Sequence, residues 1–241
     1  MYGMGGYSGA SNYSGNSGYS GSSGYSGKSG YSGATLNYSG TNGNYAMPEA
    51  PHMSMAENFL ADDRPSTPMI SNMGEIQEVI EQTYKLITKQ EFPHDSIRIL
   101  ICDENQFKQI HNSTGGNWSA GIMGFSFNKY AKGISEIYVR QDHMDSLLLT
   151  VGHEIGHVLG PTLPNAQDEE AKAHAFSLAW METIRDNDVA GLQPNIAPNP
   201  AHNGLHDVAF DYVKYLLQTG ASSFDVFQTL AHGLTSIIAQ T

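Results

Sequence analysis

Cysteine is nearly absent from this sequence: Cys102 is the single cysteine among 241 residues. One thiol cannot form an internal disulfide bond or a cysteine-based structural zinc site, and it leaves the redox compartment undetermined. Cys102 ends an apolar run, so we interpret it as a buried strand residue and not as a reactive thiol. Any chemistry of this protein must therefore come from other side chains.

Basic residues and long apolar runs are also scarce. Twelve lysines and arginines stand against 24 aspartates and glutamates, which gives a formal charge of −12. Neutralising phosphates requires clustered cations, so we expect neither a nucleic acid nor an anionic membrane as a partner. No segment approaches the roughly 18 apolar residues of a membrane span, and no signal-peptide pattern opens the sequence. We therefore expect a soluble protein, cytoplasmic by default or carried in a larger assembly.

The first 45 residues carry a low-complexity repeat. Tyr-Ser-Gly begins at Tyr7, recurs every six residues as far as Tyr31, and appears again at Tyr38. Such a polar chain with evenly spaced aromatic rings is typical of a flexible tether, or of an assembly element that self-associates through tyrosine stacking or β-like pairing. A solenoid is the weaker interpretation, because no position of the repeat supplies an aliphatic core.

Residues 46–73 are rich in proline and methionine, so we interpret them as a second linker and expect folded structure to begin near Ser71. Beyond that point, apolar residues recur with helical and with strand periodicity. The predicted strands are 96–102, 121–128 and 134–140, of which the last two form a hairpin. The predicted helices are 74–90, a short helix capped by Asp103, one that ends at Gly160, 166–185, 207–219 and 223–240. These elements predict an α+β fold with a short mixed sheet.

The stretch Thr150–Gly160 contains the pattern His-Glu-x-x-His. On a helix, His153 and His157 lie one turn apart on the same face, so both imidazoles can reach one metal ion. Glu154 then points beside them, toward a metal-bound water. The alternative is a core helix whose histidines are held by backbone or carboxylate partners.

A catalytic zinc ion takes three protein ligands and keeps a fourth position for water, so the two histidines need one more partner. A longer pattern with a third histidine is excluded, because the required position holds Leu163. The candidates on the next predicted helix are Asp168, Glu169, Glu170 and His174. Helical phase does not choose among them, since the face that carries Glu169 is at least as apolar as the face that carries Glu170.

The segment Glu170-Ala171-Lys172-Ala173-His174-Ala175-Phe176 resembles the glutamate helix of the gluzincin metallopeptidases. In that pattern a small residue follows the glutamate at plus three, Asp or Asn at plus four and an aromatic residue at plus six. The short separation from the His-Glu-x-x-His helix is most similar to the compact, single-domain minigluzincins, and the resemblance covers about residues 74–185. It implies one zinc ion and Glu154 as the general base and proton shuttle. The zinc ligands that it implies are His153, His157 and Glu170.

The resemblance also implies a domain organisation. A zincin-like metallopeptidase domain would span residues 74–186, with the sheet and its edge hairpin packed on the metal helix and the glutamate helix. Residues 187–241 would add an irregular segment and a C-terminal helical extension that packs on the same domain.

Further site residues follow from the same pattern. At plus four this sequence has His174, where the family has a carboxylate or amide that orients a zinc-bound imidazole. As a neutral imidazole, His174 could accept that hydrogen bond or act as an alternative ligand. The resemblance makes strand 121–128 the antiparallel edge above the zinc, which would bind an extended peptide by strand addition. The edge residues are Gly121, Ile122, Met123, Gly124 and Phe125.

An electrophile that stabilises an oxyanion could come from His202, His206 or Tyr212, with His232 also available, and no spacing selects one of them. The Asn-Gly between His202 and His206 favours a solvent-exposed turn over a second metal site.

These features predict a zinc-dependent endopeptidase that hydrolyses peptide or protein substrates. The alternative is a structural or assembly protein with a degenerate or latent metallopeptidase domain, because no peptidase mechanism requires a six-residue Tyr-Ser-Gly period. The two functions can also be combined in a latent, self-processing enzyme. Its tail or its C-terminal helices would then cap the active-site cleft, with Asp62 or Asp63 as the group that blocks it.

Overall fold

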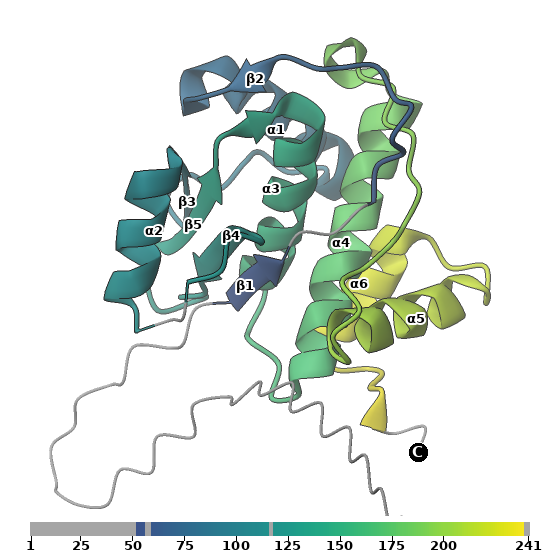
Figure 1. Cartoon of the computed structure of the whole chain (residues 1–241). Helices are drawn as coiled ribbons and strands as arrows, with labels where there is room; N and C mark the ends of the chain where they lie inside the picture. The colour runs from purple at the N-terminus through teal and green to yellow at the C-terminus, as the bar shows by residue number, and fades with distance from the viewer. Residues whose placement is uncertain (1–51, 56–58, 116–117, 239–241) are drawn as a thin grey trace, which may run out of the picture. The chain divides into compact units, whose positions relative to one another are not determined.

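A computed structural model describes residues 52–55, 59–115 and 118–238 (Figure 1). These residues belong to the larger of the two units into which the chain divides, residues 47–241. The Tyr-Ser-Gly repeats lie outside the described residues, and so does the prediction of self-association that rests on them.

Four strands form a mixed sheet in the order β1, β4, β5, β3. The parallel pair is β3 with β5, whereas β4 runs antiparallel to β5 on one side and to β1 on the other. β2 and β6 pair antiparallel in a separate two-stranded sheet. The bounds are β1 (His52–Met55), β2 (Met69–Ile70), β3 (Ile97–Cys102), β4 (Ile122–Phe127), β5 (Ser135–Arg140) and β6 (Asp142–His143). The α+β class with a small mixed sheet is therefore confirmed, as is the predicted hairpin.

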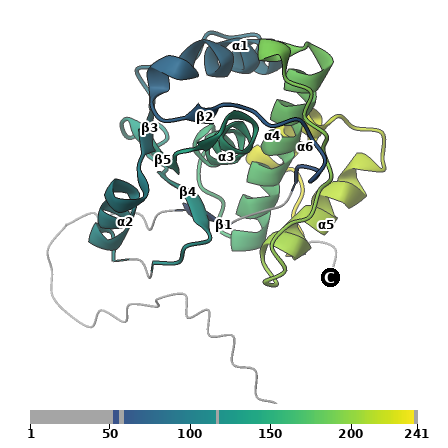
Figure 2. The same ribbon diagram turned by 45° about the horizontal axis from the view of Figure 1, so that its top comes forward.

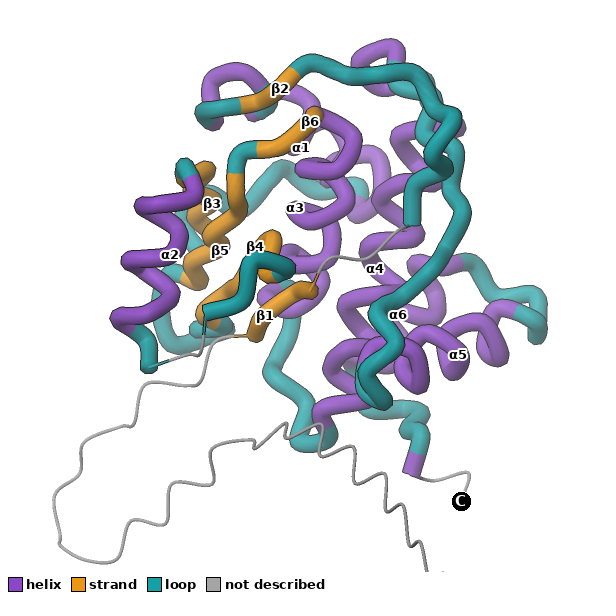
Figure 3. Tube along the Cα trace, viewed as in Figure 1, coloured by secondary structure: helices purple, strands orange, loops and turns teal. Residues whose placement is uncertain are grey.

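Helices lie on both sides of the sheet (Figures 1 and 3). α2 packs against β3 and β5, and α3 packs against β4 and β5 from the opposite side. α4 lies along α3 on the side away from the sheet, and α1, α5 and α6 pack against α4 (Figure 2). The bounds are α1 (Gln77–Thr88), α2 (Glu104–Ser113), α3 (Met144–Val158), α4 (Ala166–Asp186), α5 (His206–Leu217) and α6 (Ser223–Ala231), with short 3-10 turns at Met73–Glu75 and Val189–Gly191.

The start of α2 has a local cause that the sequence predicts. The side chain of Asp103 accepts a hydrogen bond from the backbone N–H of Gln106, and the side chain of Gln106 accepts one from the backbone N–H of Asp103. This capping box satisfies two donors that the first turn of a helix leaves open. Cys102, the residue before it, is buried, and burial together with the charge of Asp103 raises the pKa of its thiol, so the cysteine is a core residue and not a reactive one.

The pairing of α3 with α4 depends on two glycines one turn apart. A Cβ at Gly156 would lie 2.8 Å from Cα of Ala173, and a Cβ at Gly152 would lie 2.8 Å from Cγ of Trp180. Real Cβ atoms essentially never make contacts this short. Any larger residue at Gly156 would therefore push against the backbone of α4. The close approach brings polar residues of the two helices into one site.

The segment predicted as a second linker is part of the fold wherever it is described. β1 joins the sheet, and Phe59, Leu60 and Ile70 are buried in the core. The prediction that folded structure begins near Ser71 is therefore wrong. Composition misses this segment because a few apolar side chains are enough to fix an extended strand that has no periodic pattern of its own.

The last helix is shorter than the predicted range of 223–240. α6 ends at Ala231, and Gly233 then adopts the left-handed conformation with φ 65°. Leu234 and Ile238 lie within the predicted helix 223–240 but beyond the end of α6, and they are 76% and 64% exposed. Glycine favours this conformation because it has no Cβ, so the chain turns away after the nine residues of α6. None of the described helices is long and apolar enough to cross a membrane.

Candidate metal centre

α3 presents its two histidines as the local periodicity predicts. His153 and His157 are 2% and 0% exposed, and their Nε2 atoms lie 3.2 Å apart. Two ring nitrogens at this separation can both reach one metal ion. The helix around them is buried on nearly all sides, so this pair lies inside the protein and not on its surface.

Glu170 completes a group of three possible ligands. Its Oε2 atom lies 3.3 Å from Nε2 of His153 and 3.8 Å from Nε2 of His157. The three ligand atoms lie within 4.8 Å of one another, and all three residues are buried. α4 carries Glu170 into this position because Gly156 allows the two helices to approach closely. The chain therefore contains a buried His/Glu group that could hold a metal ion.

The charge state of Glu170 is set by opposing effects. Burial of the carboxyl raises its pKa, but the imidazoles of His157, His153 and His206 together outweigh burial and leave the pKa far below its usual range. Glu170 is thus held as a carboxylate, which is the form that binds metal.

Glu169, the other candidate for the third ligand, lies on the far side of His157. Its Oε1 atom is 2.8 Å from Nδ1 of His157, and its Oε2 atom accepts a hydrogen bond of 2.8 Å from the backbone N–H of Leu163. A ring whose Nδ1–H donates to a carboxylate keeps its Nε2 lone pair for a metal. Glu169 therefore orients one imidazole, while Glu170 faces the two Nε2 atoms.

A buried lysine balances this second carboxylate. Lys172 is fully buried, and its Nζ atom lies 3.0 Å from Oε1 of Glu169. The same ammonium group donates hydrogen bonds to the carbonyl oxygens of His157 and Pro161, at 3.1 and 3.2 Å. Burial lowers the pKa of Lys172, and the charge of Glu169 opposes that shift. The network ties the end of α3 to the first turns of α4.

Glu154 lies directly beneath the sheet. The residue is fully buried, and a Cβ at Gly124 of β4 would lie 2.9 Å from its Oε1 atom and 2.7 Å from Cγ2 of Thr150. Only glycine fits between the strand and the carboxylate. No local pattern singles out Gly124 for this role, because the contact joins residues 30 positions apart.

His174 and His206 lie beside the first group. His174 is fully buried, with its ring centroid 4.9 Å from that of His153 and 5.5 Å from that of His206. Nδ1 of His206 lies 3.7 Å from Oε2 of Glu170. Glu170, His174 and His206 form a second group of three ligand atoms within 4.8 Å, which shares its carboxylate with the first.

The burial of His206 corrects the sequence interpretation. His206 is 2% exposed at the first position of α5, where its backbone N–H and that of Leu205 both donate to the side chain of Asn203. His202 remains exposed in the preceding loop, as predicted. The Asn-Gly between them does form a turn, but that turn begins a helix that faces inward, and no local signal indicates this direction.

The other candidate residues do not join the cluster. Tyr212 pairs its hydroxyl with that of Thr235, and His232 pairs Nδ1 with the carbonyl of Gln228. Asp168 accepts hydrogen bonds from Ser236 and from the backbone of Ile237, so it anchors the C-terminal segment. Asp62 and Asp63 lie in an exposed turn, so the interpretation of either as a blocking group is wrong.

The predicted substrate edge is not open. β4 begins at Ile122, with Gly121 in the turn before it, and the strand pairs antiparallel with β1 over His52–Met55. The implication that this strand forms the edge of the sheet is therefore wrong for the described chain. Pairing of backbone groups leaves no pattern in the sequence, so the sequence does not predict β1.

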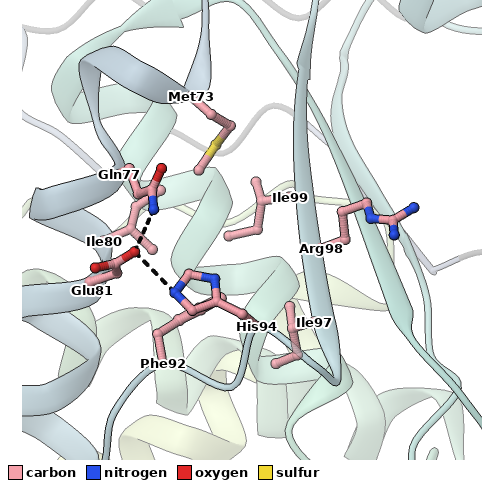
Figure 4. A pocket seen from close by; sticks show the side chains of 9 residues that line it. All are labelled: Met73, Gln77, Ile80, Glu81, Phe92, His94, Ile97, Arg98 and Ile99. Atoms are coloured by element: carbon pink, nitrogen blue, oxygen red, sulfur yellow. Dashed lines mark hydrogen bonds and ion pairs between the residues drawn. The ribbon is translucent and has the colours of Figure 1, made fainter.

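A separate pocket lies between α1 and β3 (Figure 4). Gln77 and His94 both approach the carboxylate of Glu81, at 2.7 and 3.1 Å. The residues that line the pocket are Met73, Gln77, Ile80, Glu81, Phe92, His94, Ile97, Arg98 and Ile99. None of them belongs to the histidine cluster, so the pocket is not part of the candidate metal centre.

Comparison with known proteins found no family model, no curated protein and no solved structure that matches this chain.

Proposed function

We propose that this chain is a zinc-dependent endopeptidase with a zincin-like domain. The observation that carries the proposal is the convergence of His153, His157 and Glu170 on one point, with the carboxylate of Glu154 buried beside them under β4. The pattern of residues alone is compatible with a core helix. A core helix does not require a carboxylate from a second helix to face both Nε2 atoms.

The donor set suits zinc. Two imidazole nitrogens and one carboxylate oxygen are the ligands of many catalytic zinc sites, which keep a fourth position open. The hydrogen bond of His157 Nδ1 to Glu169 supports this fit, because metal-binding imidazoles usually donate their second N–H to such a partner. Bound zinc would supply a Lewis acid that polarises the scissile carbonyl and acidifies water.

The side chains of this chain would do the rest. Glu154 takes a proton from the attacking water and delivers it to the leaving amine, so the same carboxylate acts first as base and then as acid. Its burial under β4 keeps bulk water away from that exchange. His206 is the one proposed oxyanion stabiliser that lies at the cluster, and its imidazole would donate a hydrogen bond to the oxygen that gains charge.

The test uses Glu154→Gln beside Glu91→Gln, a control whose side chain is 80% exposed. Zinc content is measured by mass spectrometry of the metal, and cleavage is measured on a peptide library and on the chain itself. We expect all three proteins to bind one zinc ion, and Glu154→Gln to lose about 10²- to 10⁴-fold in cleavage rate. A wild-type protein that binds zinc and cleaves neither the library nor itself would refute the proposal.

The repeat supports a second function. Tyrosines spaced six residues apart from Tyr7 to Tyr31 have no part in peptide hydrolysis, and they suit assembly of several chains. Deleting residues 1–45 should then reduce the molar mass that light scattering measures. An unchanged oligomeric state would exclude assembly through the repeat.

A further inference from the structure

We propose that β1 (His52–Met55) is the resident peptide ligand of β4, and that a substrate must displace β1 before it can reach Glu154. That a peptide substrate displaces β1 rests on the proposed peptidase function. That β1 occupies β4 rests on the contacts alone. β4 becomes an edge strand only when β1 leaves it, and the class of molecule that it would then accept is an extended, antiparallel peptide.

The first contact is the pairing of β1 with β4. Met53 lies opposite Phe125 and Ser54 lies opposite Gly124, after which the register shifts so that Met55 lies opposite Ile122. On its other side β4 pairs with β5, so its backbone is bonded on both sides within the described residues. An extended peptide that adds to β4 would use the same backbone groups that β1 now uses.

The register places the resident strand at the proposed chemistry. Gly124 packs so closely on the carboxylate of Glu154 that no side chain fits between them. Its partner in β1 is Ser54. β1 also contacts α3 directly. The strand therefore runs past the general base, and not along a remote part of the sheet.

The second contact lies beside His174 of the histidine cluster. Phe59 is 1% exposed, and its ring centroid lies 5.5 Å from that of His174 and 4.9 Å from that of Phe210. Its carbonyl accepts a hydrogen bond of 2.8 Å from the backbone N–H of Ala197. Leu60 forms a bridge with Ile196. The sheet thus holds the chain at β1, and the 195–197 loop holds it at Phe59 and Leu60.

A third set of contacts fixes the far end of the segment. Arg64 forms an ion pair with Asp145 at the start of α3, and the hydroxyl of Thr67 donates to the same carboxylate at 2.8 Å. β2 then pairs with β6. Because these contacts do not involve β4, the segment can release β1 while its downstream part stays folded.

The experiment disrupts β1 in the full chain. In Met53→Pro/Ser54→Pro two adjacent N–H groups are lost, and one of them must face β4, because successive N–H groups of a strand point to opposite sides. The matched control is Ser39→Pro/Gly40→Pro in the repeat. Both changes are combined with Glu154→Gln, so that binding is measured without cleavage. Circular dichroism and thermal unfolding check that each variant is folded.

The probe is a fluorescent peptide with the sequence of residues 50–59, and its binding is followed by anisotropy. If β1 occupies the edge most of the time, we expect the β1 variant to bind the peptide at least about tenfold more tightly than the control. Equal affinity of the two folded variants, or no binding by either, overturns the inference. A third outcome separates the two proposals. If the β1 variant binds the peptide more tightly, but the same variant with Glu154 restored does not cleave it, the inference holds and the peptidase function is refuted.

Discussion

Gly156→Ala tests whether the approach of α3 to α4 builds the metal centre. The added Cβ would lie 2.8 Å from Cα of Ala173, 3.0 Å from Cβ of Phe176 and 3.1 Å from the carbonyl oxygen of Ala173. Ordinary contact begins at 3.4 Å, so the helices must separate by about 0.6 Å at this point. Two of the three opposing atoms belong to the backbone, and they cannot rotate away.

Two free-energy terms of opposite sign decide the stability of this variant. Overpacking a core typically costs about 1–3 kcal/mol, and alanine recovers up to about 1 kcal/mol over glycine within a helix. The difference spans about 0–3 kcal/mol, and because the backbone of Ala173 cannot rotate away we take a net loss of about 1–2 kcal/mol. For a domain of this size each kcal/mol shifts Tm by about 2–4 °C, so we expect Tm to fall by several degrees.

The same shift should weaken the metal site. Ligand distances tolerate changes of about 0.2 Å, and the expected displacement moves Glu170 away from both histidines by more than that. We expect zinc affinity to fall by about tenfold or more, measured by competition with a coloured chelator. Gly160→Ala is the matched control, because its Cβ would meet only Cβ of Ala231 at 3.8 Å. If Gly156→Ala matches this control in both Tm and zinc affinity, the close approach does not position the ligand.

Two further predictions concern the residues around the ligands. Glu169→Gln should lower zinc affinity by about 10- to 100-fold, because the amide loses the charge that holds the ring of His157 and balances the buried Lys172; competition titration checks this, and an unchanged affinity would mean that Glu169 does not orient the ring. His206→Ala should still bind one zinc ion per chain but lose about 10²- to 10³-fold in kcat, because an oxyanion donor acts on the transition state and not on the metal. Native mass spectrometry counts the zinc ions. If the wild type binds two ions and the variant binds one, His206 is instead a ligand of a second site that shares Glu170.

The sequence by itself determined the local parts of this protein. The four-residue spacing of His153 and His157 places both rings on one face of any helix, whatever packs around it. The capping box at Asp103 and the hairpin of 121–140 likewise depend on neighbours in the chain. These features could be predicted because the helical and strand periods and the turn residues are encoded within a few positions.

Only the tertiary structure decided which distant residues join that helix. Glu169 and Glu170 are adjacent in sequence, and the close packing at Gly156 turns one toward the Nε2 atoms and the other toward Nδ1 of His157. The inward turn of His206 and the pairing of β1 with β4 leave no sequence pattern. Backbone hydrogen bonds are the same for every residue type, so the occupant of a sheet edge is fixed by the fold and not by composition.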